Sequence, residues 1–250
     1  AAFAAFLWFL PFFSISIFSL ISILLVIFFV KSPKEKAPPV AFKDFVQRVK
    51  KTFKEEGKWL FVVFLNGIYV MLVLFGMLFF LSENLEKAHD IKGVKKGFVL
   101  AIPLLMLCIA SFVTGRKIKG DLKAIKRMIL ISLVITSISI VFVGFLKENL
   151  IFLLVVTSIA GIALGALLPV LDAIITENIR KEERGTVTSF YSSARFIGVA
   201  AGPPIMSLLM KNNLNAFYIA SCVLGIILLF LVLKFIDIQA IGQQAKANAK

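Results

Sequence analysis

Residues 151–176 read IFLLVVTSIAGIALGALLPVLDAIIT, a stretch in which Asp172 is the one ionisable residue. A helix needs about 20 such apolar residues to cross the hydrocarbon core of a bilayer. In lipid, a helix is also the only way for an isolated segment to satisfy its own backbone hydrogen bonds. The stretch is therefore predicted to be a transmembrane helix.

Six further stretches of the 250-residue chain meet the same criterion. The seven predicted spans are Leu7–Val30, Trp59–Leu81, Phe98–Gly115, Met128–Leu146, Ile151–Thr176, Thr186–Met210 and Ala216–Phe235. Hydrophobic residues make up 60% of the chain, whereas soluble domains are about 45–50% apolar. We therefore expect an all-α membrane protein with seven transmembrane helices and the lipid bilayer as its main partner.

Basic residues are distributed unevenly among the predicted loops. Of the 28 Lys and Arg residues, 21 lie in segments 31–58, 116–127 and 177–185 and in the tail from residue 234, and six lie in the opposite loops. The positive-inside rule places the first set and the C-terminus in the cytoplasm and the N-terminus outside. The net charge of +14 is thus attributed to topology, and no nucleic-acid partner is expected.

The beginning of the sequence is unusual for a protein whose N-terminus faces outward. It starts at Ala1 without Met and lacks the charged region of a signal peptide. We therefore expect the C-terminal portion of a longer protein, whose missing N-terminal transmembrane half would be a partner of this chain.

A segment of different composition, residues 31–58, separates the first span from the other six. Its first part, KSPKEKAPP (31–39), contains three prolines and cannot be helical throughout. Apolar residues then recur at helical spacing among basic ones: Phe42, Phe45, Val46, Val49 and Phe53. This pattern predicts either a basic amphipathic helix lying against anionic headgroups or a solvated linker helix.

Two ionisable residues lie within predicted spans, Asp172 in the fifth and Arg195 in the sixth. Such residues are costly in a bilayer and usually have a partner or a function. Both are about equally far from the middle of the expected loop Glu177–Gly185, which predicts equal depth. We expect either a functional salt bridge or shared water-lined cavity, or a static ion pair that fixes the hairpin.

Small residues spaced four apart predict close helix packing in the same two spans. They are Gly161 and Gly165 in the fifth span and Gly198 and Gly202 in the sixth. Pro203 and Pro204 follow directly, and the pair predicts a bent or discontinuous helix of the kind that alternating-access transporters use.

The other polar groups in and near the spans carry less information. Asn66 and Tyr69 share one helical face, where they would line a cavity or form interhelical hydrogen bonds. Cys108 and Cys222 lie in apolar stretches and are interpreted as small buried hydrophobic residues, and His89 lies in a polar loop. We expect no metal, no cofactor and no enzyme.

The residues from Leu168 to Pro203 resemble the tenth and eleventh helices of major facilitator superfamily transporters, especially the bacterial drug:proton antiporter branch. In that branch the cytoplasmic loop commonly ends in Arg-Gly, as Arg184-Gly185 does, and the next helix carries the element Gly-x-x-x-Gly-Pro, here residues 198–203. The loop after the third span is similar to a degenerate copy of the family's loop motif, with Gly115, Asp121 and Arg127.

The resemblance implies a domain organisation for the whole chain. Residues 1–30 would be helix six, 31–58 the central cytoplasmic loop, 59–236 the C-terminal six-helix bundle and 237–250 a cytoplasmic tail. It further implies two three-helix inverted repeats in the bundle and a substrate site between two bundles.

The leading functional hypothesis is proton-driven efflux of small amphipathic or lipophilic compounds across a bacterial plasma membrane. Asp172 would be the coupling carboxylate and Arg195 its gate or charge partner. The alternatives are a metabolite importer on the same fold and a non-transporting membrane scaffold. A seven-helix receptor is disfavoured, because the last span has no lysine before Lys234 at its very end and no Asn-Pro-x-x-Tyr element.

Overall fold

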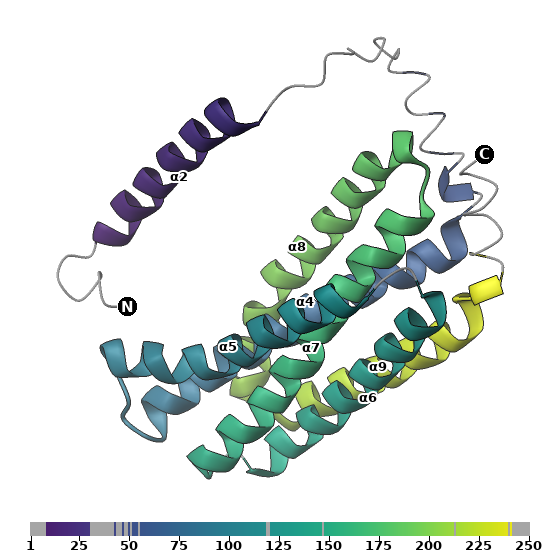
Figure 1. The fold of residues 1–250 in the computed structure, drawn as a ribbon. Helices are drawn as coiled ribbons and strands as arrows, with labels where there is room; N and C mark the ends of the chain where they lie inside the picture. The colour runs from purple at the N-terminus through teal and green to yellow at the C-terminus, as the bar shows by residue number, and fades with distance from the viewer. Residues whose placement is uncertain are drawn as a thin grey trace.

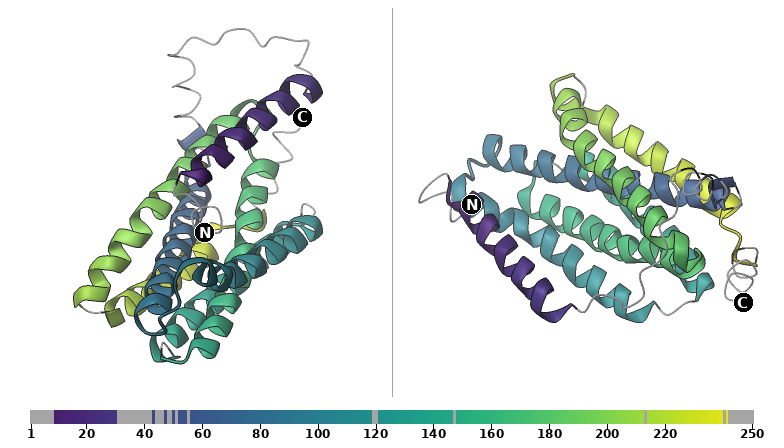
Figure 2. Two further views of the ribbon diagram at one scale, coloured as in Figure 1. Left: turned by 90° about the vertical axis from the view of Figure 1, so that its left-hand side faces the viewer. Right: turned by 90° about the horizontal axis from the view of Figure 1, so that it is seen from above.

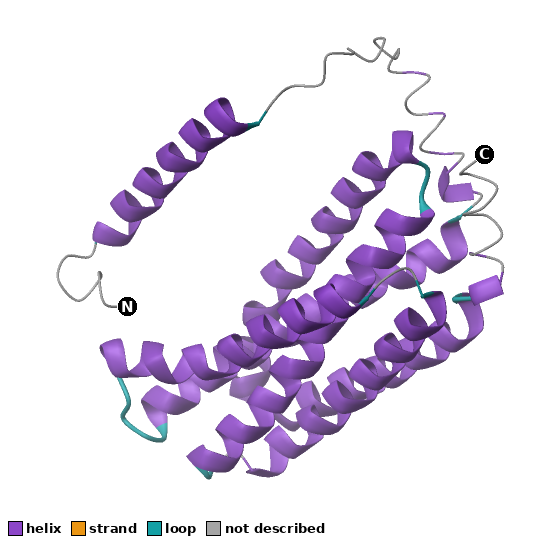
Figure 3. Cartoon of the chain, viewed as in Figure 1, coloured by secondary structure: helices purple, strands orange, loops and turns teal. Residues whose placement is uncertain are grey.

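The computed structural model describes residues 9–30, 43, 47, 50, 52–54, 56–118, 121–146, 148–212, 214–239 and 241. All regular structure in these residues is helical (Figure 3). The long helices are α2 (Leu10–Phe29), α4 (Gly57–Lys87), α5 (Gly93–Lys117), α6 (Leu122–Leu146), α7 (Leu150–Asn178), α8 (Lys181–Asn212) and α9 (Leu214–Phe235). Each of these seven is long and apolar enough to cross a membrane, which confirms the expected fold class.

Most of the helices extend beyond the predicted spans. The second span was expected at Trp59–Leu81, whereas α4 continues to Lys87, and the fourth was expected from Met128, whereas α6 begins at Leu122. The hydropathy criterion ends a span at its first charges. A helix can continue past them, because water and headgroups solvate charged side chains outside the hydrocarbon core.

The expected loop Glu177–Gly185 is wrong for the same reason. α7 continues to Asn178 and α8 begins at Lys181, so two residues, Ile179 and Arg180, join the helices. Asn178 donates a side-chain hydrogen bond to the carbonyl oxygen of Ile174. Polar residues at this end therefore extend α7 rather than interrupt it.

α2 stands apart from the other six long helices (Figure 1) and packs against none of them. Its large apolar side chains are exposed around the whole helix, among them Phe12, Phe18 and Phe28. A helix that is apolar on all sides requires lipid or another protein surface around it. The six helices from α4 to α9 form the compact bundle.

The two most closely packed pairs in the bundle, α4 with α8 and α5 with α7, are not neighbours in the sequence. α4 packs along α8, α5 along α7, and α6 lies between α7 and α9. Gly161 and Gly165 of α7 face the backbone of α5: a Cβ on Gly161 would lie 2.7 Å from the carbonyl oxygen of Pro103, and one on Gly165 would meet the carbonyl of Leu107.

The second glycine pair serves the other close contact. Gly198 and Gly202 of α8 face the backbone of α4, where a Cβ on Gly202 would lie 2.8 Å from the carbonyl oxygen of Leu72 and 2.9 Å from the nitrogen of Gly76. Both helix pairs therefore approach at backbone distance, as small residues at this spacing allow.

Of the two alternatives expected at Pro203 and Pro204, the discontinuous helix is wrong, and the bent helix stays a prediction. α8 continues through both prolines to Asn212. Each proline lacks an N–H group, but the bonds on either side maintain the helix, and transmembrane helices tolerate proline where neighbouring helices support them. Here α4 lies against Gly202 directly before the two prolines.

Candidate functional site

Asp172 of α7 and Arg195 of α8 form an ion pair. The Nη1 atom of Arg195 lies 3.5 Å from Oδ1 of Asp172, and the side chains are 23% and 46% exposed, respectively. The structure thus brings together the two charges that lie within the spans. Whether they act in transport stays a prediction.

The reason they meet differs from the expected one. The turn at Ile179-Arg180 leaves Arg195 about twice as far along its helix from the turn as Asp172 is along its own. Helical side chains point toward the N-terminus of their helix. Arg195 therefore reaches back toward the turn, while Asp172 points away from it, and the long arginine side chain spans the difference in depth.

Two residues that the sequence analysis missed support Arg195. Its guanidinium carbon lies 5.5 Å from the centroid of the Tyr191 ring, a distance typical of a cation–π contact. Tyr191 is fully buried and packs against the Phe64 ring of α4 with centroids 5.7 Å apart. Gly67 makes room for both, since a Cβ there would lie 2.6 Å from Cε2 of Tyr191 and 3.1 Å from Cγ of Arg195.

Sequence signals for these two residues were weak. Tyr191 precedes Arg195 by one helical turn, and that spacing alone indicates a possible ring–cation contact. Gly67 follows the polar Asn66 in an otherwise bulky stretch. Neither signal identifies the partner helix, which only the packing of α4 on α8 provides.

Asn66 and Tyr69 are buried inside the bundle. The hydroxyl of Tyr69 donates to the carbonyl oxygen of Ser221 on α9 at 3.1 Å, which is the interhelical alternative. The amide nitrogen of Asn66 donates to the carbonyl oxygen of Val62 on its own helix at 2.8 Å. Tyr69 therefore makes a hydrogen bond between two helices inside the bundle, and Asn66 makes one within its own helix.

The residues assigned to the loop motif after the third span lie at the end of α5 and at the beginning of α6. Gly115 lies within α5, with the nearest atom to its missing Cβ on Pro169 of α7 at 3.8 Å. Asp121 accepts the backbone N–H of Lys123 at 2.9 Å at the beginning of α6, and Arg127 is exposed on α6. Asp121 therefore has a local capping contact.

Arg184 and Gly185 lie in the first turns of α8 rather than in a loop. Nη2 of Arg184 lies 3.5 Å from the carbonyl oxygen of Ile179, which faces the turn between α7 and α8. A Cβ on Gly185 would meet no atom within 4 Å. Arg184 is thus positioned to hold the turn, and Gly185 faces open space.

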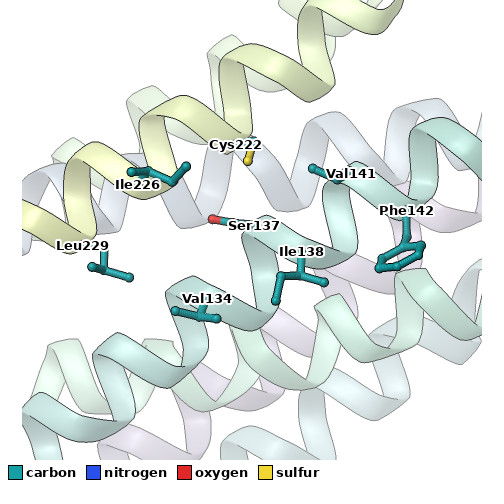
Figure 4. Close-up of a pocket in the computed structure, with 8 residues that line it drawn as sticks. All are labelled: Val134, Ser137, Ile138, Val141, Phe142, Cys222, Ile226 and Leu229. Atoms are coloured by element: carbon teal, nitrogen blue, oxygen red, sulfur yellow. The ribbon is translucent and has the colours of Figure 1, made fainter.

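Grooves between α6 and α9 offer no charged group. One has a volume of about 400 Å³ and is lined by apolar side chains together with Ser137 and Cys222, which point into the space between the two helices (Figure 4). Cys222 is partly exposed and Cys108 is exposed, so the expectation that both are buried is wrong. In a membrane helix, an apolar side chain finds an apolar environment in lipid as well as in a core.

The predicted amphipathic helix lies mostly outside the described residues, including Phe42, Phe45, Val46 and Val49 of its apolar stripe. Phe53 is described, and its ring packs edge-on against Phe64 and Phe190, each at a centroid distance of 5.9 Å. The end of the segment 31–58 is therefore attached to α4 and α8 through an aromatic cluster.

The chain is similar in sequence to a known protein family and to a known protein. The profile of the Major Facilitator Superfamily matches residues 97–249, and the chain belongs to this family of membrane transporters. The chain is also 44% identical over 237 residues to the bacillibactin exporter of Bacillus subtilis (strain 168), across 95% of this chain and 59% of the exporter. It thus spans about three fifths of the length of that relative.

Membership of this family assigns the helices to a known fold. The last six of the seven transmembrane helices form the C-terminal bundle of a major facilitator superfamily fold. The protein is a multi-pass membrane protein, and the family is one of transporters rather than of enzymes.

Proposed function

We propose that this chain forms the C-terminal portion of a proton-driven exporter of small amphipathic or lipophilic compounds, working by alternating access. The observation that carries the proposal is its 44% identity, over 95% of its length, to a protein named as an exporter. Because that relative is named for bacillibactin, bacillibactin is the first substrate to test.

The ion pair supports a role in coupling. A side chain such as Asp172, 46% exposed in the isolated bundle, cannot face hydrocarbon without a large penalty. Its open side is therefore expected to face a second bundle or a water-filled path. The missing N-terminal half would supply that surface.

The chemistry of the pair suits a proton-driven step. An ionised Asp172 attracts the guanidinium of Arg195, whereas a protonated Asp172 does not. Proton binding would therefore free Arg195 to move with α8 or to meet a substrate, and proton release would restore the pair. One proton thus changes the contact between two helices, which is the kind of two-state element that alternating access requires.

The surface of α8 is consistent with this role. α8 is the least apolar of the seven candidate spans, and Ser189 and Ser193 are exposed on it, each bonded to a carbonyl oxygen four residues earlier. Hydroxyl groups satisfied in this way can line a path for an amphipathic compound without leaving an unpaired donor in lipid.

The same proposal includes topology and location. The basic loops and the C-terminus would lie in the cytoplasm of a bacterial cell whose plasma membrane holds the protein. Residues 1–30 would correspond to helix six, 31–58 to the central loop, 59–236 to the bundle and 237–250 to the tail.

The test is uptake into inverted membrane vesicles from cells that express the complete reading frame. Energised vesicles should accumulate bacillibactin, and a proton ionophore should abolish the accumulation. Asp172→Asn and Arg195→Ala should each reduce it to the level of ionophore-treated vesicles, whereas Asp90→Asn, in the exposed turn after α4, should not.

Other outcomes would change the assignment. Accumulation in right-side-out vesicles instead would indicate an importer. Ionophore-sensitive export that survives both substitutions would leave Asp172 and Arg195 as a static structural pair, and absence of any transport would favour the scaffold.

A further inference from the structure

A cavity at one end of the bundle combines an apolar lining with two exposed lysines. It lies where α4 begins and α9 ends, and these two helix ends are side by side (Figures 1 and 2). Its volume is about 570 Å³. Its principal lining residues are Phe53, Lys54, Lys58, Phe61, Leu231 and Phe235.

No partner among the described residues neutralises the two lysines. Both side chains are exposed, and neither has an ion pair or hydrogen bond within the described part of the chain. Glu56, which lies between them in the sequence, is buried and accepts the indole N–H of Trp59 at 2.7 Å. The Glu56 carboxylate is therefore bonded to Trp59 instead of either lysine.

Polarity changes along the cavity in one direction. Lys54 lies just before α4 and Lys58 in its first turn, whereas Phe61 lies about one turn further into the bundle and is 62% exposed. On the α9 side, Leu231 likewise lies deeper than Phe235. Charge is thus concentrated at the headgroup level and apolar surface below it, in the order in which a phospholipid arranges its phosphate and its acyl chains.

We propose that this cavity is a binding site for an anionic phospholipid, with the headgroup phosphate at Lys54 and Lys58 and one acyl chain along Phe61 and Leu231. Charge complementarity selects the occupant: a zwitterionic lipid offers no net charge to the two ammonium groups, and a free phosphate leaves the apolar part empty. The aromatic contacts of Phe53 with Phe64 and Phe190 connect the site to α4 and α8.

This site is independent of the transport proposal. Anionic lipid bound here would join the end of segment 31–58 to α9, which is otherwise separate from it in the sequence. The inference requires only that the bundle resides in a bilayer.

Trp59 provides a local reporter, because it follows Lys58 directly and the chain contains two tryptophans. In a background in which Trp8 and every tryptophan of the N-terminal half are replaced by phenylalanine, the complete protein is reconstituted into phosphatidylcholine vesicles with increasing fractions of brominated phosphatidylglycerol or brominated phosphatidylcholine. Bromine quenches tryptophan over short range. We expect phosphatidylglycerol to displace bulk lipid around Trp59 roughly tenfold more effectively than phosphatidylcholine, given the attraction of two lysines at the surface.

Lys54→Gln/Lys58→Gln should abolish this preference, and Lys54→Arg/Lys58→Arg should retain it. Lys117→Gln/Lys123→Gln is the matched control: it removes the same charge from exposed lysines at the α5–α6 connection and should leave the preference unchanged. Emission of each variant without brominated lipid checks folding.

Three results would overturn the proposal. They are equal quenching by the two lipids, an unchanged preference in Lys54→Gln/Lys58→Gln, and relief of quenching by millimolar inorganic phosphate. The last would show that the lysines bind a free anion rather than a lipid.

Discussion

Gly165→Ala tests whether backbone contact between α5 and α7 holds the bundle together. A Cβ at residue 165 would lie 2.9 Å from both the carbonyl carbon and the Cα of Leu107, and still nearer to its carbonyl oxygen. All of these atoms belong to the backbone, so no side chain can rotate to make room. The two helices must separate.

The expected cost follows from that separation. Restoring ordinary contact requires a movement of roughly 0.5–1 Å, which forfeits about a quarter to a half of the dispersion energy of each contact at the opened interface. Inserting an extra carbon into a packed core costs about 1–3 kcal/mol. Alanine regains up to about 1 kcal/mol over glycine as a helix former, so we expect a net loss of about 1–2 kcal/mol.

The assay is reversible unfolding of the purified protein in mixed micelles by increasing mole fractions of sodium dodecyl sulfate, followed by helical circular dichroism. Gly185→Ala is the control, because a Cβ there meets no atom within 4 Å, and it should leave the free energy of unfolding equal or slightly higher. If Gly165→Ala were as stable as Gly185→Ala, the close approach of α5 and α7 would be refuted.

Two further predictions concern helix ends and use the same assay. Lys126→Met should lower the free energy of unfolding by about 1–2 kcal/mol, because the ammonium of Lys126 donates to the carbonyl oxygen of Ile236 at 2.6 Å, just beyond the end of α9. Lys123→Met, at an exposed position, should change the free energy of unfolding little. Equal effects of the two substitutions would contradict the capping role of Lys126. Asn149→Ala should lower the free energy of unfolding by about 1 kcal/mol, because the Asn149 side chain accepts hydrogen bonds from two backbone N–H groups at the beginning of α7. Asn149→Ser should recover most of this loss. An alanine variant as stable as the original protein would contradict the capping role of Asn149.

The sequence predicts which segments cross the membrane, but it does not predict which helices pack against each other. The stretch around Asp172 predicts a transmembrane helix because length and apolarity are local properties that lipid imposes on each segment separately. That Gly161 and Gly165 face the backbone of α5 could not be predicted in the same way. Their spacing indicates a close contact, but any of the other helices could provide it.

The candidate site shows the same division. Asp172 and Arg195 are conspicuous in sequence because charges in a span are rare, and the structure places them 3.5 Å apart. Their expected equal depth depended on a loop Glu177–Gly185, whereas the two helices turn at Ile179-Arg180. The contacts of Gly67 with Tyr191 and Arg195 could not be predicted from the sequence, because they depend on the packing of α4 against α8.

The sequence by itself determined that the chain crosses a membrane with seven helices, which apolar segment forms the centre of each, and which family it resembles. Only the tertiary structure decided that α4 pairs with α8 and α5 with α7, and that Lys54 and Lys58 share a cavity with the end of α9. The physical reason is that lipid tails are as apolar as leucine, so hydrophobicity places a helix in the bilayer without selecting its neighbour. Neighbours are selected by the shapes of surfaces that come from distant parts of the chain.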